Sequence, residues 1–187
     1  MRICLIGKNL TNFVLAKILT SKKLSVEIIH QKRKEKNFSK RTLAISKDNF
    51  NFLLNTNKKM KITAWPVKNI KIYNNQNDSK ELFEFKKENK ENFFLIKYSN
   101  IFKSFENSCK KNKKIKFKVF KDYSKINYLH EKNNYDIIIN SDVNINFNNK
   151  YLNKRIEKNY NSFAYTGIIN HKKKIMLQFK FLLNMDH

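Results

Sequence analysis

The sequence predicts an α/β fold that opens with a βαβ unit and carries a small antiparallel β insertion. The first observation is residues 2–29, "RICLIGKNLTNFVLAKILTSKKLSVEII", which combine an apolar strand, a tight turn at Gly7, an apolar-faced helix and a second strand. The second is the alternation of further strands and helices along the rest of the 187 residues. Such an order is typical of helices packed on a largely parallel sheet.

The first helix is predicted from the four-residue spacing of Leu10, Val14 and Ile18, with Phe13 and Leu15 beside this stripe. A short second helix over 46–55 begins at Ser46, a residue type whose hydroxyl caps helix N-termini. We expect the insertion to contain three strands, at 62–73, 81–85 and 93–99.

A third helix over 101–112 is expected to bury Ile101, Phe105 and Cys109 on one face. The stretch "KIKFKVFKDY" alternates apolar residues with Lys, which predicts a half-buried strand, and "YDIIINSD" predicts a buried one. We expect both to join the parallel sheet of the βαβ unit. The remaining elements are a short helix over 149–156 and strands over 160–170 and 174–183.

The net charge of +25 suggests an anionic partner, and a basic nucleic-acid-binding protein is one interpretation. However, only four of the 40 basic residues are Arg, Asn is abundant, and there are 2 Gly and 1 Pro. Because an AT-rich coding sequence raises Lys, Asn and Ile together, we attribute most of the charge to coding bias. The Lys residues are spread over nearly every segment, so we expect any nucleic-acid binding to be nonspecific and sensitive to salt.

No apolar run reaches the length of a membrane span, and the two cysteines, Cys4 and Cys109, lack a CxxC spacing. We therefore expect a cytoplasmic protein with reduced thiols and at most peripheral contact with the inner membrane face. The four His residues lack metal-ligand spacing, so neither a metal site nor a catalytic His is predicted.

The turn after the first strand stands where a dinucleotide-binding protein has three glycines, and here the three positions hold Gly7, Asn9 and Asn12. Asn9 tolerates the turn, but its side chain is expected to crowd a phosphate. We expect Asn12 to push the helix off the sheet. His30 stands where an acid would bind the ribose hydroxyls.

Four further stretches occur along the chain in this order: "RTLAISKDNFNFL", "AWPVKNIKIYN", "YDIIINSDVNIN" and "YNSFAYTGIINHKK". With the βαβ unit they resemble the FAD-dependent aromatic hydroxylases of ubiquinone biosynthesis, the 2-polyprenylphenol hydroxylase type. That family has an R-x-x-A-L-S segment beside the flavin nucleotide, an A-W-P-I strand, an A-D-G-x-x-S motif and a Y-x-x-x-A strand ending in His. The matching residues here are Arg41–Ser46, Trp65–Val67, Ser141, Asp142, Val143 and Asn146, and Tyr160, Ala164 and His171.

The resemblance implies a Rossmann-like FAD-binding domain over 1–155, with its insertion at about 60–98, and the beginning of a substrate-domain β-sheet over 156–187. It implies FAD near Gly7, Asn9, Asn12, His30, Arg41 and Asp142, NAD(P)H as reductant, and hydroxylation of a polyprenylphenol ring by a flavin hydroperoxide. No catalytic acid, base or nucleophile is implied.

The resembled family is longer, and its second flavin motif would lie beyond His187. We therefore expect a truncated or split monooxygenase whose C-terminal half a second chain could supply. The alternative is a noncatalytic remnant or partner subunit that keeps the fold without FAD. The lost glycines favour the alternative, whereas Arg41 and Asp142 favour the enzyme.

Overall fold

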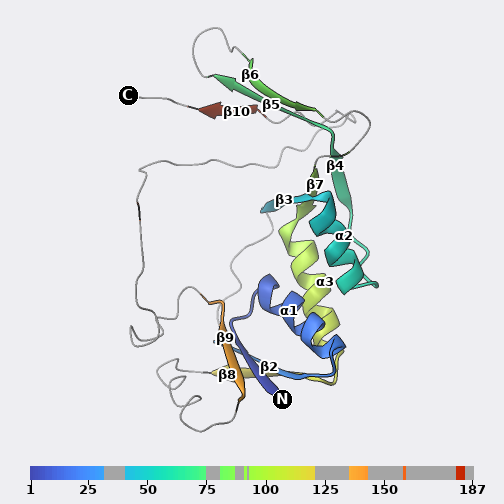
Figure 1. Cartoon of the computed structure of the whole chain (residues 1–187), viewed down its shortest axis with the longest axis vertical. Helices are drawn as coiled ribbons and strands as arrows, with labels where there is room; N and C mark the ends of the chain where they lie inside the picture. Colours follow the sequence, from blue (N-terminus) through green and yellow to red (C-terminus); the bar gives the residue numbers. More distant parts are fainter. Residues whose placement is uncertain are drawn as a thin grey trace.

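The computed structural model describes residues 1–31, 41–74, 81–86, 91, 93–120, 135–142, 158 and 180–183. The predicted helix over 149–156 and the strand over 160–170 lie outside these residues. The described chain forms one parallel sheet, three helices, one antiparallel sheet and one mixed sheet, so the predicted α/β class is confirmed (Figure 1).

The parallel sheet has the strand order β8-β2-β1-β9 and contains the predicted βαβ unit. Its strands are β1 (Arg2–Ile6), β2 (Ser25–Gln31), β8 (Ile115–Phe120) and β9 (Ile137–Asn140). β1 is central, with Ile3 beside Val26 of β2 and beside Ile137 of β9. The prediction that "KIKFKVF" and "YDIIIN" join the sheet of the βαβ unit is therefore confirmed.

Three helices accompany this sheet: α1 (Leu10–Ser21), α2 (Lys47–Thr56) and α3 (Tyr98–Lys110). α1 and α3 lie over one face of the parallel sheet, and α2 packs beside α1 (Figure 1). α2 begins after Ser46, whose hydroxyl accepts a hydrogen bond from the Asn49 N–H at 3.3 Å, as its N-cap prediction requires. α3 buries Ile101, Phe105 and Cys109 completely, so its predicted face is also confirmed.

The prediction for α1 identified the helix, and the predicted residues Leu10, Phe13, Val14 and Leu15 contact the core, but the four-residue stripe is not the most buried side. Its fully buried apolar residues are Phe13 and Ala16, whereas Val14 and Ile18 are only half-buried. The reason is that α1 lies between the sheet and the other two helices, so it contacts protein on several sides. A helix that is apolar around most of its circumference does not reveal its most buried face by spacing alone.

The strands of the predicted insertion divide between two further sheets, one antiparallel and one mixed, and each of these sheets also contains a strand from outside the insertion. One has the order β3-β7-β4 and consists of β3 (Thr42–Ser46), β7 (Phe93–Lys97) and β4 (Ala64–Val67). The stretch predicted as one strand at 62–73 divides at Lys68 into β4 and β5 (Asn69–Asn74), which belong to different sheets. β4 is an edge strand, a position that tolerates Pro66 and its missing N–H. β3 was not predicted as a strand, although Leu43 and Ile45 alternate with smaller residues.

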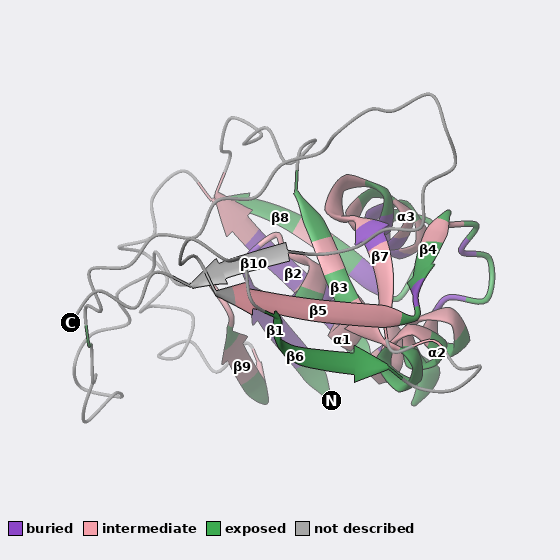
Figure 2. Cartoon of the chain, turned by 90° about the horizontal axis from the view of Figure 1, so that it is seen from above, coloured by how far each residue is buried: buried purple, intermediate pink, exposed green. Residues whose placement is uncertain are grey.

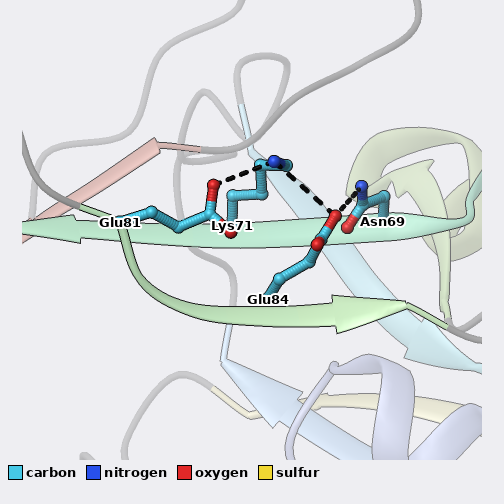
Figure 3. A network of polar contacts seen from close by, with 4 residues as sticks. All are labelled: Asn69, Lys71, Glu81 and Glu84. Carbon is cyan, nitrogen blue, oxygen red and sulfur yellow. Dashed lines mark hydrogen bonds and ion pairs between the residues drawn. The ribbon is translucent and has the colours of Figure 1, made fainter.

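The other sheet has the order β10-β5-β6, with β6 (Glu81–Lys86) and β10 (Lys180–Leu183). Every residue of β6 is exposed (Figure 2). A polar network on one face joins its two antiparallel strands: Lys71 pairs with Glu81 at 2.8 Å and Glu84 at 3.6 Å, and the Asn69 amide donates to Glu84 at 2.6 Å (Figure 3). Because β10 pairs with β5, residues 180–183 share a sheet with part of the predicted insertion, and the domain boundary at 155/156 stays a prediction.

β9 was predicted as buried, but Ile137 is 41% exposed and Ile138 and Ile139 are half-buried. β9 pairs with β1 alone among the described strands, which makes it an edge strand of the parallel sheet. An apolar run in the sequence cannot distinguish a central strand from an edge strand. No helix in the described part of the chain is long and apolar enough to span a membrane.

Asn12 is completely buried and ties α1 to the end of β1. Its side-chain amide donates hydrogen bonds to the carbonyl oxygens of Ile6 at 2.9 Å and Gly7 at 2.8 Å. The expectation that Asn12 displaces the helix is therefore wrong. The neighbouring Phe13 and Ala16 are fully buried in the same core as Ile3 and Leu5 of β1. The side chain fits because its donors replace water at two buried carbonyls.

We expect Asn12→Ala to lower the free energy of unfolding by about 1–2 kcal/mol, since it removes two buried hydrogen bonds. Urea unfolding followed by circular dichroism measures this, with the exposed Thr11→Ala as matched control on the same helix turn. Equal stability of the two variants would contradict a structural role for the Asn12 amide.

Candidate functional site at the carboxyl edge of the parallel sheet

The carboxyl ends of β1 and β9 meet beside the turn that leads into α1. From β1 the chain moves to β2 and then β8 on one side, and it returns to β9 on the other side. The gap between β1 and β9 is therefore the topological switch point, where open α/β sheets bind their ligands. Gly7 follows β1 directly, and Ser141 and Asp142 follow β9.

Gly7 is required by both its backbone and its surroundings. Its φ of +114° lies in a region that residues with a Cβ rarely adopt, and its N–H donates to Ile29 O at 2.8 Å. A Cβ at this position would lie 3.0 Å from Asn9 Nδ2 and 3.1 Å from Asp142 Cβ. The chain has 2 glycines, and these steric constraints explain why one of them stands in this turn.

The Asn9 side chain makes hydrogen bonds both within the β1–α1 turn and to the end of β9. Its Oδ1 accepts from the Asn12 N–H at 2.9 Å and so caps the N-terminus of α1. Its Nδ2 donates to Ser141 Oγ at 2.7 Å and to Ser141 O at 3.2 Å. A single side chain therefore bridges the β1–α1 turn and the end of β9 across the switch point.

Tyr98 and Arg41 belong to the same neighbourhood. Burial raises the pKa of Tyr98, while the Arg41 guanidinium and a hydrogen bond from the Leu10 backbone act in the opposite direction. Leu10 is the first residue of α1, so the Tyr98 phenol lies at that helix N-terminus. Arg41 stands 5.2 Å from the centre of the Tyr98 ring, and its carbonyl accepts from the Tyr98 N–H at 2.9 Å.

The structure thus brings together Gly7, Asn9, Asn12 and Asp142, and it links Arg41 to them through Tyr98. His30 lies near the carboxyl end of β2, one residue beyond Ile29, and its Nδ1 is 3.1 Å from Gln31 O. Val143, Asn146, Tyr160, Ala164 and His171, which complete the family motifs, lie outside the described residues, as do His130 and His187.

Sequence reasoning missed Tyr98 and Ser141 as parts of this site. Ser141 was noted only as a motif position, and its hydroxyl contact with Asn9 spans 132 residues of sequence. Tyr98 was assigned to the end of a strand, although it is the first residue of α3. No local pattern signals either contact.

Glu106 anchors the same turn from the side of α3. Its carboxylate is paired with Lys8 at 3.0 Å and with Lys110 at 2.7 Å. Burial acts to raise the pKa of Glu106, but the hydrogen bonds from Lys110 and Lys8 outweigh it and hold the pKa below its ordinary value. Lys8 is therefore held toward α3 by an ionised acid.

The sequence matches no family model and no curated protein. Among solved structures, FqzB is similar to 64% of this chain at 7% identity and a TM-score of 0.51, and the match spans 28% of FqzB. Two others have lower TM-scores. PqsL, a probable FAD-dependent monooxygenase from Pseudomonas aeruginosa, gives 0.49 at 10% identity, with 64% of this chain and 32% of PqsL matched. Klebsiella pneumoniae HpxO, solved with FAD and uric acid, gives 0.47 at 8% identity, with 63% and 30% matched.

The similarity to FqzB agrees with the α/β fold described above and is evidence of the fold alone. The matched regions span about a third or less of the length of the three structures.

We expect Glu106→Gln to destabilise the fold by about 1 kcal/mol at pH 7, because it removes a partly buried double ion pair. The folded-state pKa of Glu106 is lowered, so its contribution is present above the unfolded-state pKa and is lost as the pH falls through the folded-state value. The difference between wild type and variant should therefore disappear in acid.

Thermal unfolding from pH 7 to pH 3 measures this difference. Glu91→Gln is the matched control, because it breaks an exposed pair with Lys47 at 3.3 Å that should contribute little. A constant difference between wild type and Glu106→Gln across the whole range would contradict the ionic role of Glu106.

Proposed function

We propose that this chain is the nucleotide-binding part of an FAD-dependent ring hydroxylase and that it holds FAD weakly or not at all by itself. The observation that carries the proposal is the Gly7 turn at the switch point of the β8-β2-β1-β9 sheet. A dinucleotide-binding fold places its pyrophosphate at such a turn. The ordered motifs around Arg41, Trp65 and Asp142 support the assignment to hydroxylases.

The residues at the turn do not fit a pyrophosphate in the conformation described. Phosphates bind helix N-termini through backbone N–H groups. Here Asn9 takes the N–H of Asn12, and the Tyr98 phenol takes a hydrogen bond from the backbone of Leu10. Asn9 also fills the space between Gly7 and Ser141. We therefore assign no step of flavin chemistry to this chain alone.

The substrate class follows from the resemblance rather than from the geometry. The order of the motifs favours a polyprenylphenol ring of the ubiquinone type, with NAD(P)H as reductant and a further polypeptide segment that completes the site. Cytoplasmic location with peripheral contact at the inner membrane face belongs to the same proposal.

A noncatalytic partner that keeps the fold without FAD is the second candidate. The two hydrogen bonds from Asn9 to Ser141 favour it, because they stabilise the closed switch point without any ligand. In this case the chain contributes a folded α/β surface to another protein. The two candidates differ in whether opening the turn restores FAD binding.

We expect the wild-type chain to show no FAD binding at micromolar concentrations and Asn9→Gly to bind FAD at least about tenfold more tightly, since it frees helix N–H donors and space for phosphate. Glycine is nearly as good an N-cap as Asn, so the variant should fold. Asn12 is left unchanged because its buried amide holds α1 to β1. Quenching of flavin fluorescence measures the affinity.

Asn55→Gly, an exposed change in α2, is the matched control for the same substitution away from the turn. Micromolar FAD affinity of the wild-type chain would contradict the proposal that Asn9 blocks phosphate binding at the turn. If Asn9→Gly folds and still shows no FAD binding, the noncatalytic partner without FAD becomes the better assignment.

A further inference from the structure

A hollow of about 460 Å³ lies at the opposite edge of the parallel sheet, away from Gly7. Ser25 and Arg2 begin β2 and β1, and Lys113 and Lys114 immediately precede β8, so the hollow lies at the amino ends of these strands. It continues over the sheet face opposite the helices. Its lining residues are Arg2, Ser25, Val26, Glu27, Lys113, Lys114, Lys116, Lys118 and Tyr135.

The side of the sheet that each residue faces follows from strand alternation. Ile115 and Val26 belong to the core beneath α1 and α3, so Lys116, Lys118 and Glu27 point to the other face. No described helix or strand covers that face (Figure 1). The lysines of β8 therefore line the hollow rather than the helical core.

The hollow is strongly cationic. Its lining contains five basic side chains and one carboxylate, Glu27, which is hydrogen-bonded by the Tyr135 hydroxyl. A second carboxylate, Asp136, accepts a hydrogen bond from the N–H of the lining residue Arg2 at 2.6 Å. Burial and the bond to Glu27 raise the pKa of Tyr135, so the phenol stays protonated at neutral pH. Within the described ranges, no ion pair joins any of the five basic side chains to an acid.

The backbone that carries these charges is held in place. The Lys114 N–H donates to Asn112 Oδ1 at 3.0 Å, and the Lys114 carbonyl accepts from the Val26 N–H at 3.0 Å. The Asn112 amide also donates to Thr20 Oγ1 of α1 at 3.0 Å. The backbone that carries the cations is thus held on two strands and one turn.

The stretch that joins β8 to β9 does not have an acidic composition. Residues 121–134 contain Lys121, Lys125 and Lys132 against Asp122 and Glu131, so this stretch is itself slightly basic. Among the described residues, the hollow therefore has an excess of positive charge that a bound anion would neutralise.

We propose that this hollow binds a small anion that carries two or more phosphate groups. Lysine ammonium groups are point charges suited to phosphate oxygens, and the volume lies in the range of small-molecule sites. The site lies at the other end of the strands from the Gly7 turn, so it is independent of the proposed flavin nucleotide.

The test is calorimetric titration of the full chain with inorganic tripolyphosphate at two salt concentrations. The triple variant Lys114→Gln, Lys116→Gln, Lys118→Gln should weaken binding at least about tenfold, because it removes three converging charges. The matched control, Lys58→Gln, Lys59→Gln, Lys61→Gln, removes the same charge from exposed lysines between α2 and β4 and should change the affinity by less than about twofold.

Equal losses in the two triple variants would overturn the proposal, since binding would then depend on net charge alone. Tighter binding of a 20-nucleotide single strand than of tripolyphosphate, with a steeper salt dependence, would overturn it in favour of a polynucleotide. ADP in a parallel titration distinguishes a nucleotide from inorganic phosphate as the source, and either supports the site. Lys116→Gln alone serves where the triple variant unfolds, with at least about a twofold loss expected and no loss overturning the site.

The flavin proposal is tested with Asn9→Gly and FAD, and the anion site with the lysine variants and tripolyphosphate. Failure of this site and failure of the flavin proposal are therefore separable, because each has its own variant and ligand.

Discussion

The hydrogen bonds of two Asn amides around Gly7 are the constraint on which the site depends. Asn12 ties α1 to the last carbonyls of the β1 region, and Asn9 ties the same turn to Ser141 after β9. These amides occupy positions that a dinucleotide fold gives to glycine. The turn keeps its shape through side-chain bonds, and the same bonds take up the donors and the space that a phosphate would need.

The two edges of the parallel sheet differ in electrostatic character. At the carboxyl edge, the Asn9 side chain and the Asn12 amide nitrogen are hydrogen-bonded to the turn and its neighbours, while the buried Asn12 Oδ1 has no partner among the described residues, and Arg41 lies against the Tyr98 ring. At the amino edge, Arg2 and the lysines around β8 converge with one carboxylate among them. Because unpaired like charges repel and bind counterions, the amino edge is where an anion gains most.

The fold was largely predictable because strands and amphipathic helices have local signatures. The predictions failed where burial depends on neighbours: α1 is enclosed by the sheet and two helices, β9 is an edge strand, and residues 64–74 divide between two sheets. For the site, Gly7 was predictable from its place after the first strand. Tyr98 was not, because its approach to Leu10 depends on the packing of α3 against α1.

By itself, the sequence determined the α/β class, the order of the elements and the position of the turn after β1, since these follow from residue spacing and from the conformational freedom of glycine. The tertiary structure alone decided that Asn12 is a structural tie and that Asn9 closes the switch point. It also gathered Arg2 and Lys113–Lys118 into one hollow, although they are more than a hundred residues apart in sequence. Arg2 and this local group of four lysines converge because parallel strands bring their amino ends to one edge.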